Sequence, residues 1–165
     1  MRYLILGLLD GIVTSVSLAS GLLLRGVAID LRDAVSIALV VATVNSLTSF
    51  LAEYSHQKAS LRGLEYKLSL KSTGRIMRTL VHRRALKASA RSALYNFSAS
   101  LAGASAVLLP SSISTRFGFY ALAAATVAAA AALARSPAEF GEWLLMIGIS
   151  AGIGFVVGVL FPVAA

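Results

Sequence analysis

Residues 4–24 read LILGLLDGIVTSVSLASGLLL, an apolar run interrupted by a single carboxylate, Asp10. About 20 mostly apolar residues are enough for a helix to cross a bilayer, so the run predicts a membrane-spanning helix. A carboxylate at membrane depth costs about 3 kcal/mol on insertion scales and needs a partner, a water-filled cavity or a bound cation. Asp10 is therefore the first candidate functional residue.

The composition predicts an integral membrane protein with one transmembrane domain over residues 1–165. Hydrophobic residues make up 58% of the chain and charged residues 13%, whereas a soluble domain carries about 25% charged residues. The chain has no Cys, which excludes disulfides and thiolate metal sites. The sequence contains no evident nucleophile–base pair or metal-binding His cluster, so we expect neither an enzyme nor a resident cofactor.

Four further apolar runs follow the first, which together predict an all-α protein with five transmembrane helices. The fourth run is rich in Ala, and small side chains suit packing among helices. The third is expected to end before Pro110 and the fifth before Pro162. The five expected spans are 4–24, 34–52, 88–109, 117–134 and 140–161.

Positive charge is concentrated in one connection. Ten of the fifteen Lys and Arg residues lie between Lys58 and Arg91, with Glu65 as the single acid among them. By the positive-inside rule, residues 56–87 form a cytoplasmic loop, with the N-terminus in the cytosol and the C-terminus outside. This location accounts for the net charge of +8, so we do not expect the protein to bind nucleic acid. The loop is expected to be helical, and it either lies against anionic lipid or only sets the topology.

Polar side chains recur at helical spacing on one face of each of the first two expected spans. They are Asp10, Thr14 and Ser17 on the first span and Asn45, Ser49 and Glu53 on the second. Asp10 and Glu53 are then in the same leaflet, within about two helical turns in height. Two carboxylates with hydroxyl and amide oxygens nearby suit a divalent cation. The pair could instead share a proton, or Asp10 could pair with Arg91.

Glycine pairs four residues apart form a further pattern. Such small-xxx-small pairs allow close contact between helices, either within one chain or at a dimer interface. The pairs are Gly7 with Gly11, Gly148 with Gly152, and Gly154 with Gly158.

Four motifs, in their order along the chain, resemble the spans of the vacuolar iron transporter family. The resemblance covers nearly the whole chain, including the span count, the orientation and the one long loop. The motifs are LGLLDGIVTSVSLASGL (6–22), LTSFLAEYSHQKASLRGLEYKL (47–68), RSALYNFSASLAGASAVLLP (91–110) and GEWLLMIGISAGIGFVVGVLF (141–161).

The resemblance implies a five-helix exchanger that carries Fe²⁺, and often Mn²⁺, out of the cytosol against protons. It also implies a homodimer with the ion path between the first helices of the two copies. Asp10 matches the pathway Asp of the family, and Glu53 matches its Glu at the end of the second span. Thr14, Asn45 and Ser49 would supply neutral oxygens. The location would be the cell membrane of a prokaryote or an organelle membrane of a eukaryote.

The chain departs from the family in two places. Thr48 and Ser49 stand where the family commonly has Ser-Met, and oxygen ligands alone favour hard ions such as Mn²⁺. The basic loop offers only Glu65, Met77 and His82 as weaker metal ligands. Two other functions stay open. One is a proton-coupled exporter of organic cations, which would have an aromatic-lined cavity, and the other is a non-transporting scaffold or lipid-binding protein.

Overall fold

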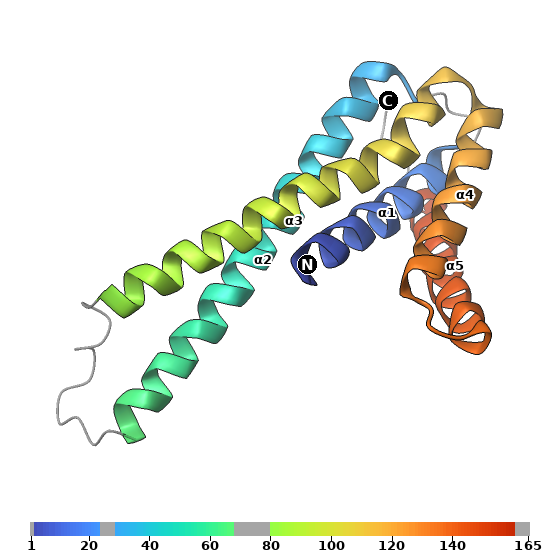
Figure 1. Cartoon of the computed structure of the whole chain (residues 1–165). Coiled ribbons are helices and arrows are strands. Elements are labelled where there is room, and N and C mark those ends of the chain that lie inside the picture. Colours follow the sequence, from blue (N-terminus) through green and yellow to red (C-terminus); the bar gives the residue numbers. More distant parts are fainter. Residues whose placement is uncertain (1, 24–28, 68–79, 161–165) are drawn as a thin grey trace.

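The computed structural model describes residues 2–23, 29–67 and 80–160, and these ranges contain five helices. No strand occurs in these ranges, so the all-α prediction is confirmed for them (Figure 1). The helices are α1 (Arg2–Leu23), α2 (Leu31–Lys67), α3 (Leu80–Ile113), α4 (Thr115–Leu133) and α5 (Pro137–Leu160).

Four helices in the described residues are long and apolar enough to cross a membrane. They match the first four expected spans and cover Tyr3–Leu23, Leu31–Gly63, His82–Ile113 and Thr115–Leu133. The fifth expected span corresponds to α5 in sequence. Its passage through a membrane and the orientation of the termini remain predictions.

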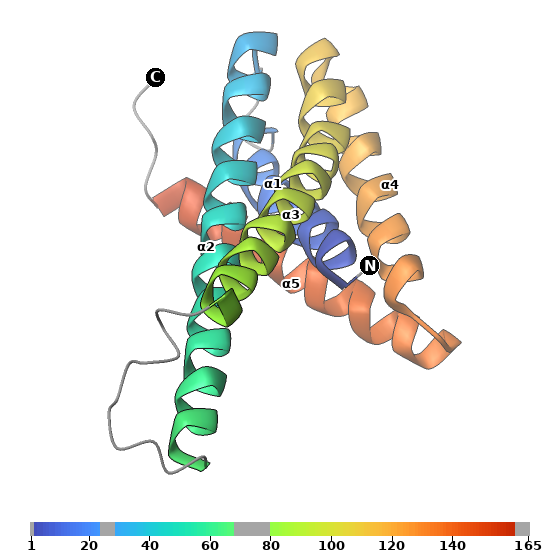
Figure 2. The same cartoon turned by 60° about the vertical axis from the view of Figure 1, so that its left-hand side comes forward.

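Helices α2 and α3 are longer than their expected spans. They contain 37 and 34 residues, or about 55 and 51 Å at 1.5 Å per residue, against about 30 Å for the hydrocarbon core. The two run antiparallel and extend well beyond the other three helices (Figures 1 and 2). Within the basic loop, residues 56–67 and 80–87 are helical, and α2 passes straight through Gly63. Residues 68–79 lie outside the described ranges.

The third helix does not stop before Pro110, as the sequence predicts, but continues to Ile113. Proline cannot donate a backbone hydrogen bond, which normally breaks a helix interior. Here the hydroxyls of Ser111 and Ser112 donate to carbonyl oxygens of the preceding turn at 2.7 and 2.8 Å. These bonds reach the carbonyl oxygens of Val107 and Leu109, whereas Pro110 removes the helical donor to the Ala106 carbonyl. Because α3 ends three residues after Pro110, the proline costs the helix one bond in its last turn.

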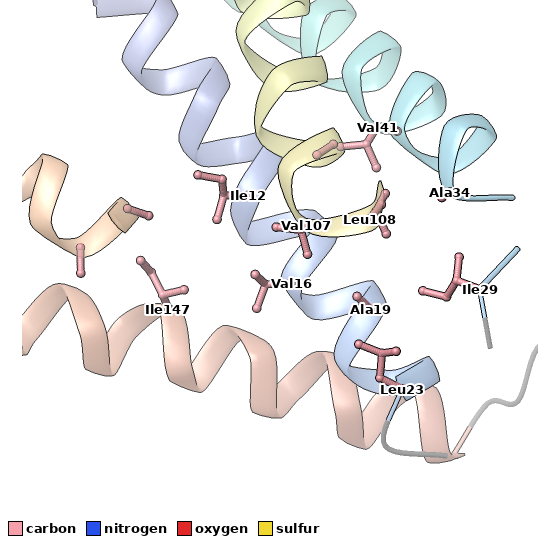
Figure 3. Close-up of a cluster of buried hydrophobic side chains, with 14 residues drawn as sticks. Ile12, Val16, Ala19, Leu23, Ile29, Ala34, Val41, Val107, Leu108 and Ile147 are labelled. Carbon is pink, nitrogen blue, oxygen red and sulfur yellow. The ribbon is translucent and has the colours of Figure 1, made fainter. Parts of the chain in front are cut away.

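Helix α1 lies at the centre of the bundle and contacts all four other helices. The core is a cluster of buried apolar side chains around it (Figure 3). The cluster includes Ile12, Val16, Ala19 and Leu23 of α1, Val107 and Leu108 of α3, and Ile147 of α5.

Large apolar side chains also cover the outer faces of the described helices. Leu51, Leu94 and Tyr120 are 63%, 66% and 72% exposed. Water-soluble monomers rarely expose contiguous apolar surface on this scale, whereas lipid tails are as apolar as leucine and cover it at little cost. Together with the four apolar helices, these faces support a membrane location.

Candidate functional site

Asp10 lines a cavity of about 270 Å³ between α1, the end of α4 and α5. Apart from Asp10, the lining residues are Leu6, Leu9, Val13, Thr14, Leu133, Trp143 and Ile147. Those from α1 share one face because their spacing follows the helical repeat. The cavity thus combines one carboxylate and one hydroxyl with an indole ring and aliphatic side chains. Such a site can bind a cation or exchange a proton at Asp10.

Glu53 is not among the residues that line this cavity. Its carboxylate accepts hydrogen bonds from the Tyr3 hydroxyl and, at 2.7 Å, from Nε2 of Gln57. Glu53 therefore ties the beginning of α1 to α2. The chain by itself places the two predicted ligands, Asp10 and Glu53, in different surroundings.

The close contact between α1 and α3 explains this separation. Gly7 and Gly11 face the α3 backbone, whereas Asp10 lies three residues after Gly7, about 60° around the helix. Helix α1 thus presents its glycines to α3 and turns Asp10 toward α5. On the α5 side, Ser17 Oγ lies 3.1 Å from both the carbonyl oxygen and Oγ of Ser150.

The predicted path residues on α2 belong to a different interface. Asn45 donates from Nδ2 to Oγ of Ser100 on α3 at 3.0 Å. Ser49 is half-buried and lies one helical turn from both Asn45 and Glu53. Among the predicted path residues, Thr14 alone accompanies Asp10 at the cavity.

A buried polar stripe on α3 was missed at the sequence level. Its members are Ser89, Ser92, Asn96 and Ser100, all at most 5% exposed. Both polar side-chain atoms of Asn96, and Oγ of Ser15, are buried without a hydrogen-bond partner. The spacing of the stripe, i, i+3, i+7 and i+11, is the signal that could have revealed it.

The weaker metal candidates do not gather around Asp10. The His82 ring packs edge-on against Tyr54, with 6.0 Å between the ring centroids. Met77 and the side chain of Glu65 lie outside the described residues. In the part of the chain that the structure describes, no three His, Asp or Glu side chains are grouped to hold a metal ion.

The alternative partner of Asp10, Arg91, is engaged elsewhere. Its guanidinium donates to the Tyr95 hydroxyl from Nε at 3.1 Å and from Nη2 at 2.9 Å. Arg91 does not line the Asp10 cavity.

Comparison with known proteins does not assign the chain to a family. No protein-family model, curated protein or solved structure matches the chain. The likeness to vacuolar iron transporters therefore rests on the sequence motifs alone.

The predicted glycine pairs divide into two groups. Gly7 and Gly11 pack against α3, and Gly154 packs against Ser17 of α1. A Cβ added at Gly148 or Gly152 would meet no atom within 4 Å, so these two glycines are not needed for packing among the described residues. The surroundings of Gly158 lie outside the described side chains, and a role for any pair in a dimer stays a prediction.

Proposed function

We propose that the chain is a membrane transporter that exports a divalent metal cation, Mn²⁺ or Fe²⁺, from the cytosol in exchange for protons. The observation that carries the proposal is the Asp10 carboxylate, which lines a mostly apolar cavity beside a helix of membrane-spanning length. An acid in such surroundings is costly, and intramembrane acids usually mark ion or proton paths. The metal, the proton exchange and the homodimer come from the family resemblance.

Exchange follows from the charge of Asp10. The ionised carboxylate is costly in the apolar cavity unless a positive charge neutralises it, and either a proton or a metal ion can do so. Because the two compete for one carboxylate, entry of one favours release of the other. Asp10 and Thr14 together offer three oxygens, and water or a second copy of the chain would complete the coordination of about six that Mn²⁺ prefers.

The residues on α2 would serve a separate stage of transport. Glu53 would meet the ion at the cytoplasmic end of the path, where Tyr3 and Gln57 hold its carboxylate. Asn45 and Ser49 would supply neutral oxygens between Glu53 and the membrane interior. In this proposal the ion passes from the α2 residues to Asp10.

A second candidate function is proton-coupled export of a small organic cation. The lining of the cavity favours it, because Trp143 and five aliphatic side chains surround the single carboxylate. The face of an indole attracts organic cations, and aliphatic walls suit their hydrocarbon parts. The volume of about 270 Å³ is close to the lower end of the range for small-molecule sites, about 300 Å³.

A flux assay in liposomes tests both candidates. The purified chain is reconstituted under a pH gradient, and uptake of Fe²⁺, Mn²⁺, Co²⁺, Ca²⁺ and a lipophilic quaternary ammonium dye is followed together with proton flux. We expect metal-dependent proton flux that is abolished in Asp10→Asn and kept in Asp33→Asn, because Asp33 is an exposed acid in the first turn of α2.

The other outcomes separate the alternatives. Full transport by a folded Asp10→Asn variant would rule out exchange at Asp10. Flux of the dye alone would replace the metal with an organic cation. If neither substrate moves and neither binds saturably, the chain is a non-transporting scaffold.

A further inference from the structure

A second cavity, of about 410 Å³, lies between α2 and α3 on the basic side of the molecule. Four of its lining residues, His56, Gln57, Ser60 and Arg84, carry side chains that can donate hydrogen bonds. The others are apolar: Leu61, Ala85 and Ala88. None of the lining residues is acidic, so the cavity presents donors to a ligand that accepts. We call these seven residues the Arg84 cleft.

Positive charge surrounds the Arg84 cleft. Further basic side chains lie on the same two helix arms: Lys58 and Arg62 on α2, and Arg83, Lys87 and Arg91 on α3. Clustered charge of one sign raises the local concentration of counter-ions. The acid Glu53 lies one turn from Gln57, and the basic side chains on the two arms outnumber it. The field at the cleft therefore favours an anion.

With the span ends expected from the sequence, the cleft lies at the height of lipid headgroups. His56 lies four residues beyond the end of the second expected span at Ala52, and Arg84 lies four residues before the third begins at Ala88. Four residues of helix correspond to about 6 Å. The headgroup layer occupies roughly 5 to 7 Å on each side of the hydrocarbon core, so both side chains are expected within it.

We propose that the Arg84 cleft binds the phosphate group of an anionic lipid. Arg84 would pair with the phosphate, because guanidinium geometry matches two phosphate oxygens, and His56, Gln57 and Ser60 would donate to the remaining oxygens. The proposal concerns a site separate from the Asp10 cavity and does not depend on transport. Gln57 lines the cleft and also donates to Glu53, which lies outside the Asp10 cavity.

Binding of short-chain lipids to the full chain in neutral detergent tests the proposal. Native mass spectrometry would measure binding of short-chain phosphatidylglycerol, of short-chain phosphatidylcholine and of inorganic phosphate. The key variant is Arg84→Gln. Its matched control is Arg83→Gln, which removes the same charge from the neighbouring residue, outside the cleft lining.

We expect saturable binding of phosphatidylglycerol and at least tenfold weaker binding of phosphatidylcholine. A basic residue that acts only through the field near a membrane surface contributes up to roughly fivefold in affinity, and a direct guanidinium–phosphate pair adds charge-assisted hydrogen bonds to that. Arg84→Gln should therefore weaken binding by more than about tenfold, and Arg83→Gln by no more than about fivefold. Circular dichroism would check that both variants keep their helix content.

Each remaining outcome has a defined meaning. Equal losses in the two variants would assign the affinity to the diffuse positive field and overturn the site. Equal binding of the two lipids would overturn the requirement for a net negative headgroup. Inorganic phosphate that competes with phosphatidylglycerol supports the phosphate chemistry, and its failure to bind assigns the site to the intact lipid.

Discussion

Gly7 on α1 and Asn96 on α3 meet backbone to backbone: a Cβ added at Gly7 would lie 2.5 Å from the Asn96 carbonyl oxygen. Gly11 repeats the contact one turn later, against the backbone of Ser100. These two glycines therefore allow α1 and α3 to approach closely, as small residues do between membrane helices. The contact also determines which face of α1 carries Asp10 toward α5.

Gly7→Ala should destabilise the fold. The new methyl group cannot be accommodated without moving α1 away from α3, and overpacking of this kind costs about 1 to 3 kcal/mol. Gly148→Ala is the matched control, because a Cβ there would meet no atom within 4 Å. Unfolding in mixed micelles, followed by circular dichroism, measures both. Equal stability of the two variants would show that the contact is not tight.

Asn96→Leu should leave stability unchanged or raise it by up to about 2 kcal/mol. Both polar side-chain atoms of Asn96 are buried without a partner, and an apolar side chain of similar size removes that cost. Asn45→Leu provides the contrast, since it breaks the bond to Ser100 and should cost about 1 kcal/mol. A clear loss of stability in Asn96→Leu would reveal a bound water molecule or another partner of the amide.

Tyr3→Phe should lower stability by about 1 to 2 kcal/mol. The substitution removes the hydroxyl that donates to Glu53, and hydrogen bonds to charged groups are stronger than neutral ones. Tyr120→Phe is the control, because Tyr120 is 72% exposed, and it should stay within about 0.5 kcal/mol of the parent. Chemical denaturation of the three proteins in one detergent gives the comparison. No difference between the variants would mean that the hydroxyl contributes nothing to stability.

Trp143 should report ligand binding at Asp10. It is the single Trp of the chain, so all tryptophan fluorescence of the protein comes from it. Because Trp143 lines the same cavity as Asp10, this fluorescence reports on the cavity. Titration with Mn²⁺, which is paramagnetic, should quench the emission saturably in the parent protein and not in Asp10→Asn. Quenching by an organic cation, with no response to Mn²⁺, would support the second candidate function. Equal quenching in parent and variant would place the metal outside the cavity.

Asp10→Leu should stabilise the protein while abolishing flux. A carboxylate in a mostly apolar cavity costs free energy that a leucine does not, and we expect a gain of about 1 to 3 kcal/mol. Functional residues commonly trade stability for activity in this way. The readouts are unfolding in mixed micelles and metal uptake in liposomes. A loss of stability would instead indicate that Asp10 has a structural partner.

The helices could be predicted from the sequence because apolar runs of span length are a local property of the chain. The residues at which the helices end could not be predicted, because they depend on contacts with groups elsewhere in the fold. Helix α3 continues past Pro110 to Ile113, whereas the sequence predicts an end at Leu109. The buried stripe around Asn96 was visible as spacing, but spacing alone does not say which face is covered.

The sequence by itself determined an all-α chain, the runs long enough to cross a membrane, the placement of positive charge and the presence of a costly carboxylate at Asp10. Only the tertiary structure decided what surrounds that carboxylate. Two helices can each carry a polar face, but the orientation of each helix about its own axis decides whether those faces meet. The glycine contacts with α3 fix the rotation of α1, which brings Asp10 to Trp143 and leaves Glu53 with Tyr3 and Gln57.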